Sequence, residues 1–107
     1  MRRYELGMAH DAGALDMTLA AAAGSDPQLH AELRAAFLES VARQIDLLAR
    51  SRCDGNWTVA AMRLKGLAAS FHVAPLATLA EDALNAAPGE PTVVRRLSEW
   101  ISEFSDY

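Results

Sequence analysis

The strongest constraint on the fold is an apolar stripe that follows Asp26 and Pro27 and extends for about six helical turns. Its residues recur at spacings of three and four, the period of one face of an α-helix. They are Leu29, Leu33, Phe37, Val41, Ile45 and Leu48. Asp26 is a suitable N-cap, and Pro27 suits the first helical position because its missing N–H needs no partner there. So long a stripe must be covered by other helices, and the sequence therefore predicts a helical core.

Three later stretches supply helices that can cover this stripe, because each repeats apolar residues at the same spacing. They are residues 57–71, 75–85 and 92–104. Glycine, proline and asparagine mark the breaks between them, and short breaks favour antiparallel neighbours. We expect Trp57 and Trp100 to be core residues.

An alanine-rich segment precedes these helices. From Asp11, a suitable N-cap, to Ala23 it has high helix propensity, and Gly24 is a suitable C-terminal cap. We therefore expect an all-α domain over residues 11–107, made of four amphipathic helices and a short N-terminal helix, after a flexible leader at residues 1–10. No segment shows the alternation of a strand.

Charge and cysteine content exclude several classes of function. Fourteen acidic against ten basic residues give a net charge of −4, and the arginines are scattered, so we expect no nucleic-acid surface. The single cysteine, Cys53, has no partner for a disulfide, which favours a reducing compartment. No secretion signal follows Arg2 and Arg3, and no apolar run approaches the ~20 residues that span a bilayer. We therefore expect a cytoplasmic protein that does not interact with membranes.

The residues contain no constellation that indicates an enzyme. The sequence has neither a base–nucleophile pair nor a glycine-rich phosphate loop, so no catalytic residue is expected. His10 and His30 lack neighbouring cysteine or carboxylate ligands at metal-binding spacing. We expect no metal and no cofactor.

The helix at residues 57–71 carries an unusual second face, which we call the Met62 face. It consists of Thr58, Met62, Lys65, Gly66 and Ala69. Outward positions of a surface helix are usually long polar residues, and a glycine in a helix interior costs about 1 kcal/mol relative to alanine. Gly66 therefore indicates the close approach of a partner beside Lys65 or tight packing against a neighbouring helix, unless the glycine is merely tolerated.

The same helix carries a motif with a known counterpart. Residues 61–66, Ala-Met-Arg-Leu-Lys-Gly, read with Leu76, Leu79 and Ala80, resemble the A-H-x-L-K-G core of histidine phosphotransfer (HPt) domains. Upstream, residues 26–38 resemble the second helix of that family, and residues 54–57 resemble the turn that enters its phosphoacceptor helix. The resemblance covers most of the chain after residue 24. It implies an antiparallel up-down-up-down four-helix bundle.

The motif departs from the family at its central position. Family members carry the phosphoryl group on a histidine, and the matching residue here is Met62. A thioether cannot accept and return a phosphoryl group, because that role needs a nucleophilic ring nitrogen. Leu67 stands where serine is common, and His72-Val73 where a Gly-Ala pair often ends the helix. Lys65 and Gly66 match the pattern.

The resemblance implies a signalling module of a two-component phosphorelay. Its Met62 face is expected to dock the receiver domain of a response regulator, or a histidine kinase, without phosphotransfer. In this interpretation Lys65 pairs with acidic groups of the receiver's phosphorylation pocket, and Gly66 admits the partner's loops. Replacing histidine by methionine keeps the face apolar, and methionine adapts readily to partner surfaces.

Two alternatives remain open from the sequence. The first is an active phosphocarrier that uses another histidine, with His72 as the candidate. His72 lies about 15 Å along the helix axis from Met62 and about 80° around it, which argues against that role and favours a place near the helix C-terminus. The second is a structural helical bundle that has left the pathway and forms a homodimer. We expect a monomer, with the homodimer as the alternative.

Overall fold

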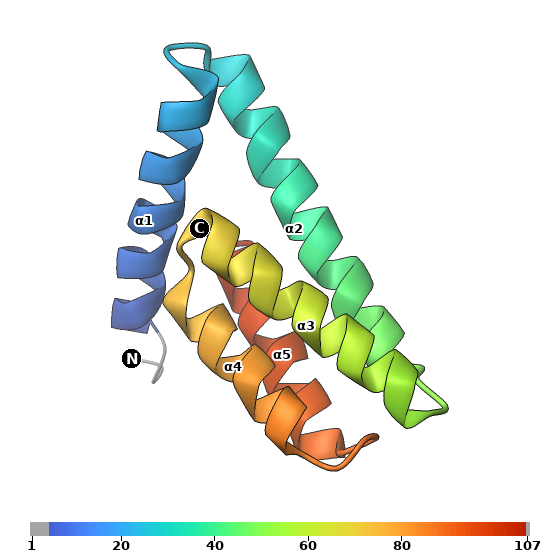
Figure 1. Cartoon of the computed structure of the whole chain (residues 1–107). Coiled ribbons are helices and arrows are strands. Elements are labelled where there is room, and N and C mark those ends of the chain that lie inside the picture. Colours follow the sequence, from blue (N-terminus) through green and yellow to red (C-terminus); the bar gives the residue numbers. More distant parts are fainter. Residues whose placement is uncertain (1–4, 107) are drawn as a thin grey trace.

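The structure, a computed structural model, describes the backbone of residues 5–106 and the side chains of residues 12–106. The chain forms five helices, α1 (Glu5–Ala23), α2 (Pro27–Ala49), α3 (Asp54–Phe71), α4 (Ala74–Asn85) and α5 (Pro91–Phe104) (Figure 1). No strand occurs in residues 5–106. The all-α class predicted from the sequence is therefore confirmed.

Helix α1 differs from the prediction in its start and its length. It begins at Glu5 and not at Asp11, and with 19 residues it is not short. Residues 5–10, expected to belong to a flexible leader, are therefore helical, whereas residues 1–4 of that leader lie outside the described part of the chain. Residues 5–10 include the good helix formers Glu, Leu, Met and Ala, and these outweigh the single unfavourable glycine, Gly7. The helix ends as predicted, with Gly24 in the left-handed conformation at φ 67°.

Helix α2 begins as the sequence predicts. The Asp26 carboxylate accepts hydrogen bonds from the backbone N–H groups of Gln28 and Leu29, at 3.0 and 3.2 Å, and Pro27 occupies the first turn. Figure 1 shows α1 and α2 diverging from the turn at residues 24–26, with α3, α4 and α5 between their far ends.

The apolar stripe of α2 is buried only in part. Phe37, Val41, Ile45 and Leu48 are in the core, whereas Leu29 is 37% exposed. The reason is visible in Figure 1, where the first turns of α2 extend beyond α3, α4 and α5. The stripe therefore continues past the helices that cover it.

Both tryptophans are core residues, as predicted. Trp57 and Trp100 are each 2% exposed. The indole Nε1 of Trp57 donates a 2.8 Å hydrogen bond to the backbone carbonyl of Ala83 on α4. Trp100 stacks on Phe104 with ring centroids 4.7 Å apart. The Trp57 bond ties the start of α3 to the end of α4.

Candidate functional site

The Met62 face lies on the outside of α3. Thr58, Met62, Lys65, Gly66 and Ala69 are all exposed, and Met62 is 59% exposed near the middle of the helix. The opposite side of α3 carries the buried residues Trp57, Ala61, Leu64 and Ala68. At 100° per residue, burying that side turns the Met62 face toward solvent. The five residues singled out from the sequence therefore share one exposed surface.

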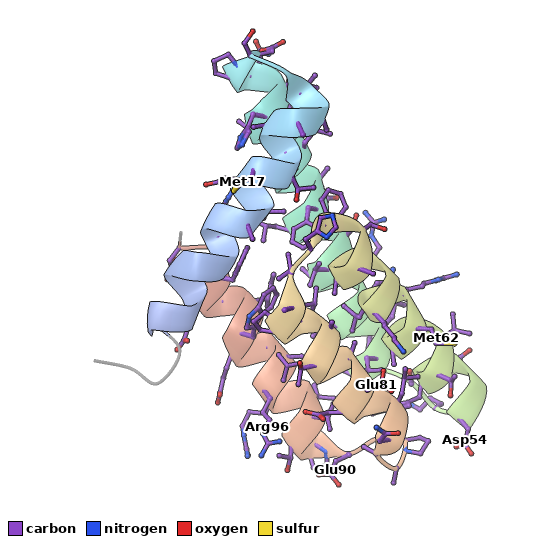
Figure 2. The ribbon with its side chains drawn as sticks, turned by 60° about the vertical axis from the view of Figure 1, so that its left-hand side comes forward. Met17, Asp54, Met62, Glu81, Glu90 and Arg96 are labelled. Carbon is purple, nitrogen blue, oxygen red and sulfur yellow. The ribbon has the colours of Figure 1, made fainter. Side chains whose placement is uncertain are left out.

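Lys65 is held by an ion pair that the sequence analysis did not predict. Its Nζ lies 2.8 Å from a carboxylate oxygen of Glu81 on the neighbouring α4, and the two side chains are 52% and 48% exposed. Figure 2 labels Met62 on α3 and Glu81 on α4. An exposed pair of this kind contributes about 0–1 kcal/mol to stability. The pair orients the ammonium group and leaves it free to change partners at small cost.

Gly66 has no structural reason to be glycine within the described chain. A Cβ built on it meets nothing within 4 Å, and its φ is not positive. The sequence left open whether Gly66 packs tightly against a neighbouring helix. Tight packing is wrong for the described residues, and two interpretations remain, the approach of a partner and a glycine that is merely tolerated.

The space around Gly66 is open enough to accept an alanine side chain. Gly66→Ala is expected to raise the free energy of unfolding by about 0.5–1 kcal/mol, because alanine loses less backbone entropy in a helix and meets no obstacle here. Chemical denaturation followed by circular dichroism measures this change. Gly13→Ala is a suitable comparison, since Gly13 is also helical and open. A loss of stability in Gly66→Ala would show that the glycine is required for packing.

His72 ends α3 in a left-handed conformation with φ 58°. The backbone N–H of His72 bonds to Ala69 and that of Val73 to Ala68, at 3.4 and 2.9 Å, in the pattern of a Schellman motif. Glycine is the usual residue at such a position. His72 is therefore at the helix C-terminus, as predicted, and its side chain is exposed beyond the end of the Met62 face.

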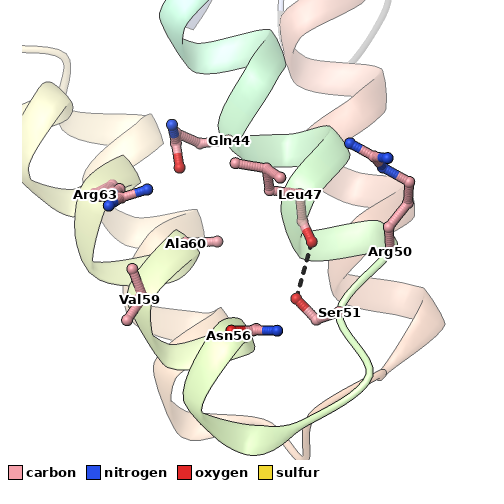
Figure 3. A pocket seen from close by; sticks show the side chains of 8 residues that line it. All are labelled: Gln44, Leu47, Arg50, Ser51, Asn56, Val59, Ala60 and Arg63. Carbon is pink, nitrogen blue, oxygen red and sulfur yellow. Dashed lines mark hydrogen bonds between the residues drawn. The ribbon is translucent and has the colours of Figure 1, made fainter.

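An open groove between α2 and α3 was not found from the sequence. It has a volume of about 430 Å³ and is lined by Gln44, Leu47, Arg50, Ser51, Asn56, Val59, Ala60 and Arg63 (Figure 3). We call it the Arg63 groove. The sequence offered one clue to this groove, because Leu47 and Val59 are apolar residues outside the predicted stripes. In the structure these two side chains are 37% and 47% exposed.

Other kinds of site have little support in the described residues. No group of three or more His, Cys, Asp or Glu side chains there is placed to hold a metal ion. None of the helices in the described part of the chain has the length and apolar character needed to cross a membrane. Cys53 is exposed and unpaired just before α3.

Comparison of the chain with protein-family models, with curated proteins and with solved structures gave no match.

Proposed function

We propose that this chain is an HPt-like signalling module that docks the receiver domain of a response regulator, or a histidine kinase, through the Met62 face. The observation that carries the proposal is the 59% exposure of Met62 near the middle of α3, at the position where HPt domains present their histidine. Lys65 and Gly66 are exposed beside it, in the order of the motif. A large apolar side chain so exposed is a suitable centre for a protein contact.

The arrangement of the helices supports the same proposal. The connections between α2, α3, α4 and α5 are short, and consecutive helices joined by short loops are usually antiparallel neighbours. The course of these helices in Figure 1 is compatible with the up-down-up-down four-helix bundle of the family. Helix α1 is then an addition to that bundle.

In this proposal the module binds its partner without accepting or transferring a phosphoryl group. Met62 offers no nitrogen nucleophile, so it cannot form a phosphoryl intermediate. Lys65 keeps its charge and can leave Glu81 for a carboxylate of the receiver, because an exposed pair is weak. The module would occupy a receiver's docking surface in the cytoplasm and thereby modulate the pathway.

The test is to restore the missing histidine. The wild type, Met62→His and Met17→His are each incubated with phosphorylated receiver domains encoded in the same genome. Phosphate is followed by intact mass under alkaline conditions, which preserve phosphohistidine. We expect one phosphoryl group on Met62→His and none on the wild type. Met17 is the matched control, because it is an exposed methionine on α1, away from Met62 (Figure 2).

The other outcomes separate the alternatives. A labelled wild type whose label disappears in His72→Gln would make the chain an active carrier and overturn the proposal. If no receiver or kinase binds the wild type and Met62→His stays unlabelled, the docking function is refuted. A homodimer with Met62 at its interface, seen by sedimentation and cross-linking, would favour the structural bundle.

A further inference from the structure

The Arg63 groove has no acidic lining residue and one arginine that is free to bind an anion. None of the eight residues that line it carries a carboxylate, and two of them, Arg50 and Arg63, are arginines. Arg50 is paired with Asp46 at 2.8 Å, outside the groove. Arg63 has no ion pair with any described residue and is exposed. Arg63 is therefore the group most able to bind an anionic partner.

Apolar side chains lie beside these charges. Figure 3 shows Leu47 on the α2 side of the groove, facing Val59 and Ala60 on the α3 side. Leu47 and Val59 are partly exposed, and Ala60 is 3% exposed. An aliphatic side chain placed between α2 and α3 would remove apolar surface of both helices from water.

Gln44 adds an unpaired polar atom to the lining of the groove. Its Oε1 is buried and accepts no hydrogen bond from the described chain. A buried acceptor without a donor is costly, and such atoms are uncommon in folded proteins. The hydroxyl of Ser51, by contrast, already donates to the carbonyl of Leu47 at 2.9 Å. The Gln44 oxygen is closed to solvent in this structure, and a turn of its amide toward the groove would let it accept an N–H group of a ligand.

The groove and Lys65 lie on different sides of α3. Relative to Met62, Val59 and Arg63 are rotated about 60° and 100° toward α2, whereas Lys65 is rotated about 60° the other way, toward Glu81 on α4. The groove contains neither Met62 nor Lys65. It is a second surface that adjoins the Met62 face, since Arg63 and Gly66 line a neighbouring hollow, and the ligand inferred for it does not depend on the function proposed for that face.

We propose that the Arg63 groove binds an extended acidic peptide segment of a partner protein, in which an aliphatic residue stands next to a glutamate or aspartate. The aliphatic side chain lies between Leu47 and Val59, the carboxylate binds Arg63, and a peptide N–H donates to Gln44. An extended segment has free main-chain N–H groups, which a helix interior lacks. The absence of acidic lining residues makes the groove complementary in charge to such a segment.

The experiment uses the full chain and three fluorescein-labelled peptides of equal length. One alternates leucine with glutamate, and the others replace every glutamate by glutamine or by lysine. Fluorescence anisotropy gives the affinities, and amide NMR shifts locate the contact. We expect the glutamate peptide alone to bind, with shifts at Gln44, Val59 and Arg63. Arg63→Gln is expected to weaken binding about tenfold.

The controls distinguish a specific groove from general attraction. Arg95→Gln removes another exposed arginine, on α5, and is expected to leave the affinity unchanged. Val59→Ser tests the apolar contact and is expected to weaken binding without removing a charge. The proposal is overturned if no peptide binds, if the glutamine peptide binds equally well, or if Arg63→Gln and Arg95→Gln have the same effect. Shifts centred on Met62, or equal binding of a single-stranded oligonucleotide, would also contradict it.

Discussion

Trp57→Ala is expected to lower the free energy of unfolding by about 3–5 kcal/mol, a large share of the roughly 5–15 kcal/mol that stabilises a small domain. Trp57 is 2% exposed, so its removal leaves a cavity at the contact of α3 with α4. It also removes the 2.8 Å hydrogen bond to the carbonyl of Ala83. Urea denaturation followed by far-UV circular dichroism measures the loss.

Trp57→Phe separates the two contributions. It keeps most of the buried ring and removes the N–H donor, so we expect a smaller loss of about 1–3 kcal/mol. Met17→Ala, at a side chain 76% exposed, is the surface control and should change stability little. A Trp57→Ala protein as stable as Met17→Ala would mean that α3 and α4 do not pack as described.

Met62→Glu is expected to weaken receiver binding about thirtyfold, or about 2 kcal/mol. The substitution replaces the exposed apolar centre of the Met62 face with a carboxylate. A receiver whose phosphorylation pocket is acidic would then meet a like charge, and Lys65 would gain a second anionic neighbour. Isothermal titration calorimetry with the receiver that labels Met62→His measures the effect.

Met17→Glu is the matched control for this experiment. It makes the same chemical change at another exposed methionine, on α1 (Figure 2). Both variants are expected to fold, because neither site is in the core, and circular dichroism checks this. Equal affinities of Met62→Glu and Met17→Glu for the receiver would remove Met62 from the interface.

Much of the helical organisation could be predicted because it depends on local patterns. The spacing of Phe37, Val41, Ile45 and Leu48 identified the buried side of α2, and Asp26 marked its start. The same reasoning failed at the start of α1. Residues 5–10 lack a regular apolar stripe, and helix propensity alone is a weak guide to where such a segment begins.

The composition of the Met62 face could also be predicted, because all its residues belong to one helix. Thr58, Met62 and Lys65 are spaced by four and three residues, so they share a face wherever the helix begins and ends. Glu81 could not be assigned to Lys65, because that pairing depends on how α3 and α4 are aligned along each other. The Arg63 groove depends in the same way on the spacing between α2 and α3. Contacts between helices are set by packing, which one-dimensional periodicity does not record.

The ion pair between Lys65 and Glu81 also bears on how docking responds to ionic strength. A lysine that exchanges Glu81 for a receiver carboxylate gives up one screened contact as it gains another. Added salt weakens the internal pair and the intermolecular one together. If Lys65 binds a receiver as proposed, its release from Glu81 makes the affinity fall less steeply with salt than it would for an unpaired lysine.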